Sequence, residues 1–475
     1  MTRCLHDAPV VGRACPHLLM REQSYHVRFT GRGKDLELVC AACVATPGPL
    51  VEICATCREQ ASCDGLAGIS GTPEVLDAPI ALTFEHARVA LPDDFVDVEP
   101  IVDGDRALWL ALARDGRVVR WDADRGDVRT LAKLELATDQ PVTLRVSRDG
   151  RFAGIAARGG LAGAIVELAG GRITMALSRD NYHAEHCDFS LAFVEHGGRT
   201  LVVHATEWNR LDVSDAATGE LLTPRGPTRY GRDEPRPPHY LDYFQCGLVV
   251  SPGHCRIADN GWVWHPVGCV ATWSLDAWLD RNVWESEDGP TRRTLCWRDY
   301  FWDGPLTWLD DTRLAVWGYG TDDEHLIAAV RVFDVTAGAE LDWFPGPRGA
   351  LVFDRELASL DGLTLWDVER GARLARDPAQ LARYHPGAKI YAGLPASGEF
   401  ATCRVRGIDA AASWSTPMIR ALARRIAHDR AFPELPVLGD ALLLAGCPDA
   451  DMIAHCHAPG EHGARCWVLD RLVEP

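Results

Sequence analysis

The stretch LTLWDVERGARL, residues 363–374, contains the unit that this chain repeats: an apolar run, an Asp, a turn that ends in Gly, and a second apolar run. The same order returns in VVRWDADRGDVRTL (118–131), LDVSDAATGELL (211–222) and VRVFDVTAGAEL (330–341). Asp and Gly favour tight turns, and apolar runs of this length favour strands. Each copy therefore predicts a β-hairpin.

The spacing of the copies predicts how the hairpins are organised. The matched aspartates, Asp122, Asp215, Asp334 and Asp367, are 93, 119 and 33 residues apart, irregular but near multiples of a ~40-residue unit. The strand-rich region 79–406 holds 328 residues, which predicts a β-propeller of about seven four-stranded blades. Two β-sandwich domains are the alternative, but they would have no reason to repeat this phrase.

A resemblance supports the propeller. The WD dipeptide before a Gly turn, together with SRDGRFAGIAA (147–157), resembles divergent WD40-type β-propellers, although the GH that often opens a WD40 repeat is missing. Several longer phrases resemble an uncharacterised bacterial family that joins a cysteine-rich N-terminus to a WD40-like propeller. These are PHYLDYFQCGLVVSP, DNGWVWHPVGCVATWSLDAW, NVWESEDGP, WDGPLTW and LAVWGYG. The resemblance implies an architecture and no activity.

Residues 1–63 hold 7 of the 16 cysteines, which predicts a local function for that segment. Cys40 and Cys43, then Cys54 and Cys57, form two CxxC pairs on either side of the turn signal TPGP. Four such thiolates suit a structural, tetrahedral Zn²⁺ and leave no open position for catalysis. The alternative is a set of buried thiols or a redox pair.

Upstream, a CxH pair and a CPH sequence provide possible ligands for a second zinc ion: Cys4, His6, Cys15 and His17. The alternative is that these side chains stabilise turns or are partly exposed. We expect residues 1–63 to form a zinc-ribbon-like module. A linker at 64–78 is expected to join it to the propeller.

Residues 407–475 predict a short helical module. STPMIRALARRIAHD has apolar residues at helical spacing, with Thr416 as the N-cap and Pro417 in the first helical position. LPVLGDALLLAG and PDADMIAHCH predict two more helices, and the segment resembles a small helical module appended to many bacterial repeat proteins. Its cysteines and histidines lack knuckle spacing and are expected to pack rather than bind metal: Cys447, His455, Cys456, His457, His462 and Cys466.

Charge and hydropathy restrict the partners and the compartment. The net charge is −18, and counting charged residues places −17 of it on residues 64–414, which would repel a nucleic-acid backbone. No run of 18 apolar residues is present, and MTRCLHDAPVVGRACPH has polar residues where a signal peptide needs an apolar run. We therefore expect a cytoplasmic protein that binds neither nucleic acid nor a membrane.

Signatures of catalysis are missing from the sequence, which contains no GxSxG, HExxH or GxxxxGK[ST] motif. The most enzyme-like group is NYHAEHCD, with His183, His186, Cys187 and Asp188, but neighbouring side chains on a strand point in different directions. A non-catalytic interaction or scaffold protein is the favoured function. The alternative is a propeller enzyme that acts on a small or carbohydrate-like ligand through acidic residues near the central channel.

A protein partner is expected to bind long polar loops with aromatic residues. The loop at 225–240 is rich in proline, charge and tyrosine, and its candidate contact residues are Tyr230, Arg232, Tyr240 and Tyr243. Nine of the 16 tryptophans lie between Trp262 and Trp317 and are expected mainly to pack between blades. The sequence does not indicate an oligomeric state.

Overall fold

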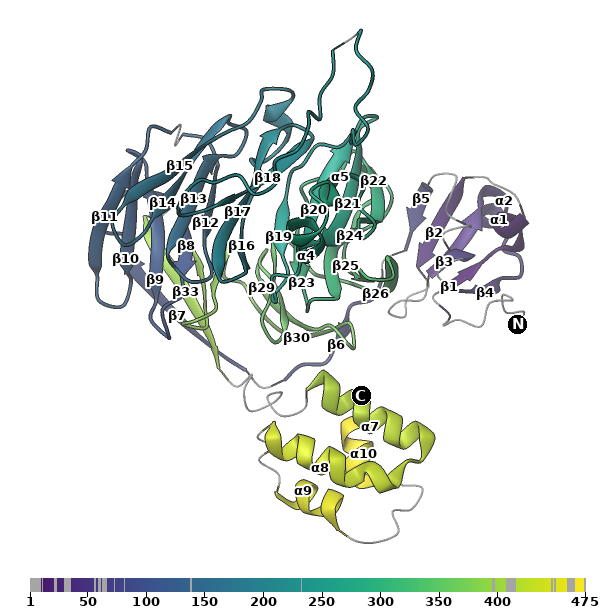
Figure 1. The fold of residues 1–475 in the computed structure, drawn as a ribbon. Coiled ribbons are helices and arrows are strands. Elements are labelled where there is room, and N and C mark those ends of the chain that lie inside the picture. The colour runs from purple at the N-terminus through teal and green to yellow at the C-terminus, as the bar shows by residue number, and fades with distance from the viewer. Residues whose placement is uncertain are drawn as a thin grey trace.

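The computed structural model has three parts: a small N-terminal module, a ring of seven sheets and a group of C-terminal helices (Figure 1). The ring is a seven-bladed β-propeller, as the repeat predicts. The structure describes residues 10, 12–20, 24–29, 36–54, 57–58, 61, 66–71, 73–80, 82–136, 139–231, 233–394, 398–406, 416–445, 447, 450–458 and 466–473.

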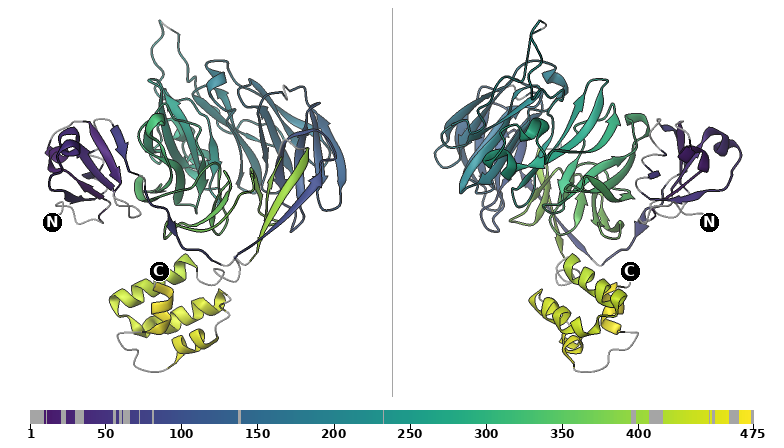
Figure 2. Two further views of the ribbon diagram at one scale, coloured as in Figure 1. Left: turned by 180° about the vertical axis from the view of Figure 1, so that it is seen from behind. Right: turned by 45° about the vertical axis from the view of Figure 1, so that its right-hand side comes forward.

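Each blade is a sheet of sequential antiparallel strands, and the blades surround a central axis (Figures 1 and 2). Blade 1 contains β8 (Phe95–Ile101), β9 (Leu108–Ala113), β10 (Arg117–Asp122) and β11 (Asp127–Lys133). Blade 2 contains β12 (Val142–Val146), β13 (Phe152–Ala157), β14 (Ala162–Glu167) and β15 (Arg172–Ser178). Blade 3 contains β16 (Leu191–His196), β17 (Arg199–Glu207) and β18 (Arg210–Asp215).

The second half of the ring follows the same order. Blade 4 contains β19 (Leu248–Val250), β20 (Arg256–Val263), β21 (Val267–Ser274) and β22 (Arg293–Asp299). Blade 5 contains β23 (Leu306–Trp308), β24 (Arg313–Tyr319), β25 (Ile327–Asp334) and β26 (Ala339–Pro345). Blade 6 contains β27 (Leu351–Phe353), β28 (Leu357–Ser359), β29 (Leu363–Asp367) and β30 (Ala372–Asp377). Blade 7 contains β31 (Arg383–His385), β32 (Ile390–Gly393), β33 (Glu399–Arg406) and the early strand β7 (Thr83–Ala90).

Blade 7 closes the ring with strands from the two ends of the propeller segment. β7 pairs antiparallel with β33 from Ala90↔Glu399 to Thr83↔Arg406, although more than 300 residues separate the partners in sequence. A closed ring removes the free sheet edges that an open stack of hairpins would expose. This pairing therefore ties the stability of the whole ring to eight residues of β7.

The repeated Asp is the residue that forms the turn between the third and fourth strands of a blade. Asp122 Oδ1 accepts hydrogen bonds from the backbone N–H groups of Asp124 and Arg125, at 3.2 and 3.1 Å. Asp215, Asp334 and Asp367 accept equivalent bonds two and three residues further on. The Gly that ends each turn has a positive φ, which L side chains rarely adopt: Gly126, Gly219, Gly338 and Gly371. The repeat is therefore a turn motif of blades 1, 3, 5 and 6.

Blades 3 and 4 depart from the regular pattern. In blade 3 the fourth strand is reduced to an isolated bridge between Ser214 and Leu221, and the chain then forms the long loop that leads to β19. Blade 4 carries helices α4 (Leu275–Asp280) and α5 (Glu285–Asp288) between its third and fourth strands. Short 3₁₀ helices, η1 (Ala184–His186) and η2 (Asp323–His325), lie in two further loops.

The N-terminal module is a five-stranded sheet in the order β4-β1-β3-β2-β5, with short helices among its described residues. Its elements are β1 (Gly12–Ala14), α1 (Pro16–Met20), β2 (Tyr25–Phe29), β3 (Leu36–Cys40), α2 (Ala41–Ala45), β4 (Val51–Ile53) and β5 (Leu66–Ser70). Its core also includes Ala329 and Trp343 of blade 5, so the module packs against the propeller.

The segment expected to be a linker, 64–78, contributes strands to both neighbours. β5 pairs parallel with β2 of the module. β6 (Leu76–Asp77) pairs parallel with β30 and extends blade 6. The small residues of this segment predict a linker, and open sheet edges on both sides provide backbone partners for it.

Within the described residues, the C-terminal part has four α-helices, one more than the sequence predicts: α7 (Pro417–Asp429), α8 (Leu435–Leu444), α9 (Ala450–His457) and α10 (Trp467–Val473), with η3 (Phe432–Glu434) before α8. Thr416 caps α7 as expected, because its Oγ1 accepts a hydrogen bond from the Ile419 N–H at 3.2 Å. Cys447, Cys456 and Cys466 pack in the apolar core of these helices. Of the helices in the described ranges, none has the length and apolar character needed to cross a membrane.

Candidate functional site

One end of the propeller collects the loops that carry most of the candidate residues. In an antiparallel blade, the turn between the second and third strands and the loop to the next blade lie at the same end. Around blades 3, 4 and 5 these are the inter-blade segments 179–190, 223–247 and 300–305 and the turns 208–209, 264–266 and 320–326. We call this end the loop face. The loop before β19 rises above the ring there (Figure 1).

An aromatic cluster lies at the loop face. Phe244 and Trp262 stack with ring centroids 3.9 Å apart and form its floor, at 1% and 3% exposure. Tyr182 and Trp264 contact this floor and are 45% and 39% exposed. We call the whole set the aromatic platform: Tyr182, His183, Trp208, Phe244, Trp262, Trp264 and Trp302. It combines a buried base with an accessible upper surface.

Hydrogen bonds hold the platform in place. Phe244 and Trp262 exchange two backbone hydrogen bonds, at 2.8 and 3.1 Å, which join the long loop to β20. The indole N–H of Trp262 donates to Cys187 Sγ at 3.1 Å, and that of Trp302 donates to the His186 carbonyl at 3.0 Å. These indole donors therefore attach the segment 183–187 to blade 4 and to the loop that follows it.

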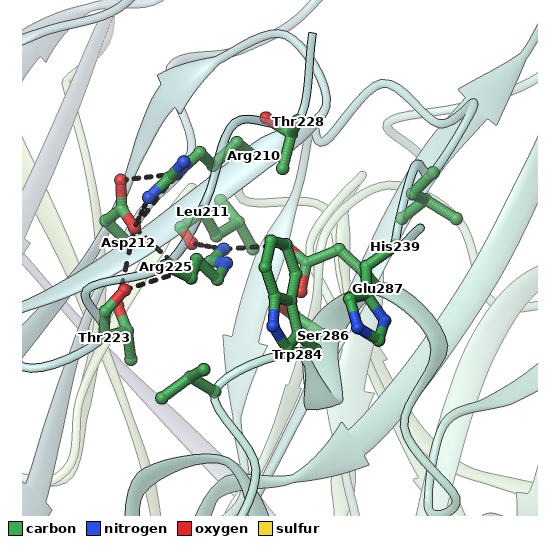
Figure 3. Close-up of polar contacts among 12 residues, drawn as sticks. Arg210, Leu211, Asp212, Thr223, Arg225, Thr228, His239, Trp284, Ser286 and Glu287 are labelled. Atoms are coloured by element: carbon green, nitrogen blue, oxygen red, sulfur yellow. Dashed lines mark hydrogen bonds and ion pairs between the residues drawn. The ribbon is translucent and has the colours of Figure 1, made fainter. Parts of the chain in front are cut away.

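The long loop is attached at its base by a buried arginine (Figure 3). The Arg225 side chain is fully buried and pairs with Asp212 at 2.8 Å and Glu287 at 2.6 Å. Burial raises the pKa of Glu287, and the charge of Arg225 opposes that rise. Trp284 lies 5.5 Å from the Arg225 guanidinium and stacks on His239. The loop therefore has a fixed base in blades 3 and 4.

The four partner residues predicted in this loop have different environments. Tyr230 is 42% exposed and meets Tyr240 edge to face, with ring centroids 5.2 Å apart. Tyr240 is half-buried and reaches Trp208 of the platform at 6.3 Å. Arg232 lies outside the described residues.

Tyr243 was predicted to contact a partner, and this prediction is wrong because Tyr243 is a core residue. It is 1% exposed, its hydroxyl donates to the Cys269 carbonyl at 2.9 Å, and the same oxygen accepts from the Gly261 N–H at 2.8 Å. The sequence placed it beside a polar loop, but the chain has already re-entered the blade at this position. Tyr243 cannot contact a partner on the folded protein.

The central channel opens beside the platform and contains charged groups. A cavity of about 240 Å³ is lined there by Arg145, Arg158, Asp188 and Asp303 together with residues of the inner strands. Arg158 pairs with Asp188 at 3.2 Å. Partial desolvation, assisted by the charge of Asp188, raises the pKa of Asp303 to about 7. Two carboxyl and two guanidinium groups therefore face one channel mouth.

The histidines of the enzyme-like phrase lie at the edge of the platform. His183 has a left-handed backbone, with φ of 52°, and its ring packs against Tyr182 and Trp264. Ligand atoms of His183, Glu185 and His186 lie within 4.8 Å of one another. Asp188 turns into the channel cavity instead. The residues of NYHAEHCD are thus divided between two sites: the histidines lie at the edge of the platform, and Asp188 lines the channel cavity.

The N-terminal module contains a tighter cluster of metal-ligand side chains. Ligand atoms of Cys15, His17, Cys40 and Cys43 lie within 4.8 Å of one another. The strands explain this meeting: β1 and β3 are parallel neighbours, with Ala14 opposite Leu38. The CPH and CAAC segments therefore leave the sheet at the same edge.

The geometry of this cluster fits a tetrahedral ion. His17 Nδ1 lies 3.3 Å from Cys43 Sγ and 3.7 Å from Cys40 Sγ. Zinc bonded to one thiolate and one imidazole at tetrahedral angles would separate those atoms by about 3.6 Å. Burial raises the pKa of Cys40, but hydrogen bonds, first from the Cys43 backbone, outweigh it and lower the pKa overall. The cluster could hold a metal ion with three sulfur ligands and one nitrogen ligand.

The pairing of the predicted ligands therefore differs from the one that CxxC spacing suggested. The group that contains Cys40 and Cys43 includes Cys15 and His17, not Cys54 and Cys57. Cys54 and Cys57 are buried in the same module core. Cys4 and His6 lie outside the described residues.

Sequence reasoning missed the two sites that arise from distant segments. The platform draws on 182–187, 208, 244, 262–264 and 302, and the channel mouth adds Arg145, Arg158 and Asp303. The density of tryptophans after residue 262 was a partial signal, but it was interpreted mainly as packing. Both sites depend on which loops share one end of the ring.

The strand order of the ring and its Asp-Gly turns identify the central domain. It is a seven-bladed β-propeller whose turns resemble those of WD40-type repeats. No family model matches the chain, and no curated protein matches it.

Two solved structures illustrate the likeness of the fold. BamB from Moraxella catarrhalis matches with a TM-score of 0.42 and 15% identity over 68% of this chain and 100% of that chain. The β-propeller domain of Cps50 (Swd1) from Myceliophteria thermophila matches with a TM-score of 0.40 and 14% identity, over 67% and 98% of the two chains.

Proposed function

We propose that this protein is a non-catalytic cytoplasmic scaffold whose propeller binds a protein partner at the loop face. The observation that carries the proposal is the aromatic platform, where Tyr182 and Trp264 are exposed above the buried Phe244 and Trp262. Large aromatic side chains dominate the binding energy of protein interfaces. Tyr230 and Tyr240 extend this surface along the long loop.

The environment of the platform supports a protein partner. Hydrogen bonds hold the Trp262 and Trp302 rings, and Tyr182 and Trp264 pack against this base, so we expect little conformational entropy to be lost when a partner covers them. Asp180, Glu185 and Glu207 lie in the neighbouring loops and strand ends, and they outnumber Arg229, which pairs with both Asp180 and Glu207. A partner with basic residues around an apolar centre would complement this charge.

The proposed role of zinc is structural. Cys15, His17, Cys40 and Cys43 would hold one ion and so keep α1 and α2 on the sheet of the N-terminal module. A four-ligand site of this type stabilises a fold rather than activating water. The module in turn packs on blade 5.

The test is affinity capture with the full chain from its native cytoplasm, quantified by mass spectrometry. Combined Tyr182→Ala and Trp264→Ala substitutions should remove at least 90% of the captured partner without lowering the melting temperature by more than about 2 °C, because exposed side chains contribute little to folding. Trp297→Ala, an exposed tryptophan of β22, is the matched control and should capture normally. Undiminished capture by the platform variant would reject this binding face.

The alternative, a propeller enzyme for a small or carbohydrate-like ligand, has one observation in its favour. Asp188 and Asp303 face one cavity, and desolvation raises the pKa of both carboxyls. Enzymes use such paired carboxyls for proton transfer. Under this alternative, Asp303→Asn would abolish turnover of a glycoside panel while partner capture persisted. Under the scaffold proposal no glycoside is turned over by the wild-type protein.

A further inference from the structure

A second group of possible metal ligands lies at the edge of the aromatic platform. Ligand atoms of His183, Glu185 and His186, in the loop before β16, lie within 4.8 Å of one another. Two imidazoles and a carboxylate are side chains that bind zinc and related divalent transition-metal ions. Partner binding at the platform requires no ion there, so the group is open to a separate role.

The local backbone brings the two imidazoles together. His183 is the N-cap of η1, and side chains three residues apart in a 3₁₀ helix lie on the same side. The rings of His183 and His186 accordingly stack, with centroids 6.0 Å apart. His183 itself has a left-handed backbone, which is uncommon for residues other than glycine. Both rings approach the carboxylate of Glu185 in this conformation.

The distances within the group suit ligands around one ion. Glu185 Oε1 lies 3.4 Å from His186 Nε2 and 3.8 Å from His183 Nδ1, and neither contact has hydrogen-bond geometry. A nitrogen and an oxygen bonded to one zinc ion at tetrahedral angles are about 3.4 Å apart. The three side chains therefore have nearly the spacing that a shared ion would impose.

Two other clusters among the described propeller residues differ in this respect. His196 Nε2 hydrogen-bonds to Asp280 at 2.8 Å, and His86 Nε2 hydrogen-bonds to Asp377 at 3.0 Å. Cys403, beside His86, is fully buried, and burial raises the pKa of its thiol to about 11, which disfavours the thiolate that metals bind. In both clusters an imidazole nitrogen already has a carboxylate as its partner.

Hydrogen bonds from two side chains fix the backbone that carries the ligands. Arg179, which is 9% exposed, donates to the carbonyls of Ala184 and Cys187 at 3.1 and 2.9 Å. The Trp302 indole donates to the His186 carbonyl at 3.0 Å. Ligands on a backbone that is already fixed lose less conformational entropy when an ion binds.

We propose that His183, Glu185 and His186 bind one divalent transition-metal ion of the zinc type at the edge of the platform. The three side chains are 36%, 65% and 54% exposed, so the ion would face solvent. Three protein ligands leave at least one coordination position for water or another donor. This site is separate from the sulfur-rich cluster of the N-terminal module, and the inference does not depend on the proposed function.

Cobalt binding to the full-length protein, without a polyhistidine tag, tests the inference. A brief EDTA wash strips an exposed ion before a buried one, and the protein is then dialysed against Co²⁺ and analysed for metal content. One Co²⁺ per chain should bind with visible d–d bands and without the sulfur-to-cobalt charge-transfer band that a cysteine ligand gives. The inference fails if no cobalt binds, or if all bound cobalt shows the sulfur band.

Two exposed ligands are then changed one at a time. His186→Gln and Glu185→Gln should each weaken Co²⁺ binding by about tenfold or more, because each removes one of only three protein ligands. Both side chains are more than half exposed, so neither change should lower the melting temperature by more than about 2 °C. Wild-type affinity in both variants would overturn the assignment.

His196→Gln is the matched control, because His196 also lies beside two carboxylates, and it should bind Co²⁺ as the wild type does. His186 is not a platform residue, so His186→Gln should capture the protein partner normally. Undiminished capture by the platform variants would reject the proposed function and leave the metal site standing. Undiminished cobalt binding by His186→Gln and Glu185→Gln would do the reverse.

Discussion

The N-terminal module and the propeller are stabilised in different ways. The module has one small core, and its candidate metal ligands come from two adjacent strand ends. The propeller distributes its apolar residues over several clusters, each formed between neighbouring blades. If the four candidate ligands hold a metal ion, they would concentrate stability at one point of the module, whereas stability in the ring is shared by many residues.

This difference indicates which changes would unfold each part. A module of about 60 residues has a small core and marginal stability, so we expect it to depend on its proposed metal ion and to unfold locally without it. A ring of blades tolerates the loss of single side chains, because each blade is held by two neighbours. Its weak point is the closing blade, where only β7 completes the sheet of β31, β32 and β33.

The largest effect is expected from removing that closing strand. The fragment 79–406 should fold as an all-β unit, whereas the fragment 91–406 lacks β7 and leaves β33 with an open edge. We expect the shorter fragment to aggregate or to show no cooperative thermal transition by far-UV circular dichroism, since an unpaired edge strand promotes association. A cooperative, monomeric 91–406 fragment would show that closure is dispensable.

Loss of metal ligands should have the next largest effect and stay local. Cys15→Ser and Cys43→Ser should each lower the zinc content of the full chain by one ion and make the module sensitive to protease. The propeller should melt within about 2 °C of the wild type, because its clusters are separate from the module. Elemental analysis and limited proteolysis measure both.

The same measurement decides which cysteines share an ion. If Cys40 and Cys43 bind with Cys54 and Cys57, as spacing suggested, Cys15→Ser would leave that ion in place. If they bind with Cys15 and His17, as the structure arranges them, Cys15→Ser and Cys43→Ser will lose the same ion. Cys255→Ser, in the propeller, is the control and should retain all zinc.

A smaller, graded effect is expected in the propeller core. Tyr243→Ala should destabilise the protein by ~3–5 kcal/mol, because it removes a buried ring and two hydrogen bonds. Tyr230→Ala, in the same loop region but exposed, should change the free energy of unfolding by less than about 0.5 kcal/mol. Chemical denaturation measures both. Equal effects would mean that the two tyrosines do not differ in burial.

The smallest effect concerns pH. Burial raises the pKa of Asp259 to about 7, although its Oδ1 accepts hydrogen bonds from the N–H groups of Cys246 and Gly247. Between about pH 4, the ordinary pKa of an aspartate, and pH 7 the folded state keeps a proton that the unfolded state has released. The contribution of Asp259 to the free energy of unfolding is therefore fully present below about pH 4 and decreases as the pH rises to 7.

Asp259→Asn keeps an acceptor oxygen for those N–H groups and does not titrate. Its melting temperature should fall less than that of the wild type between pH 5 and pH 8, by a few degrees. Parallel profiles for the variant and the wild type would contradict a protonated Asp259.

Much of the fold was predictable because its information is local. Asp122 and Gly126 lie in one turn, and the hydrogen bonds of that turn involve residues two and three positions apart. Helix α7 likewise begins at a local signal, because Thr416 accepts a hydrogen bond from the N–H group three residues further on and Pro417 follows it. Such patterns determine hairpins and helix ends without reference to the rest of the chain.

The candidate sites were only partly predictable, since they are formed by segments that are far apart in the sequence and meet only in the folded chain. Tyr230 and Tyr243 are close in sequence, yet one is exposed and the other packs inside blade 4. Tyr182 lies in the loop before blade 3 and Trp302 in the loop after blade 4, yet both belong to the aromatic platform. Their burial and neighbours follow from the order of strands around the ring.

By itself, the sequence determined that this protein is built from repeated Asp-Gly hairpins, with clustered cysteines before them and helices after them, because turns and helix caps are encoded by residues a few positions apart. Only the tertiary structure decided that Cys40 and Cys43 meet Cys15 and His17, that β7 closes the ring, and that Arg145, Arg158, Asp188 and Asp303 line one cavity. Parallel pairing of β1 with β3 and the circular order of the blades bring these residues together. Neither arrangement leaves a local signature in the chain.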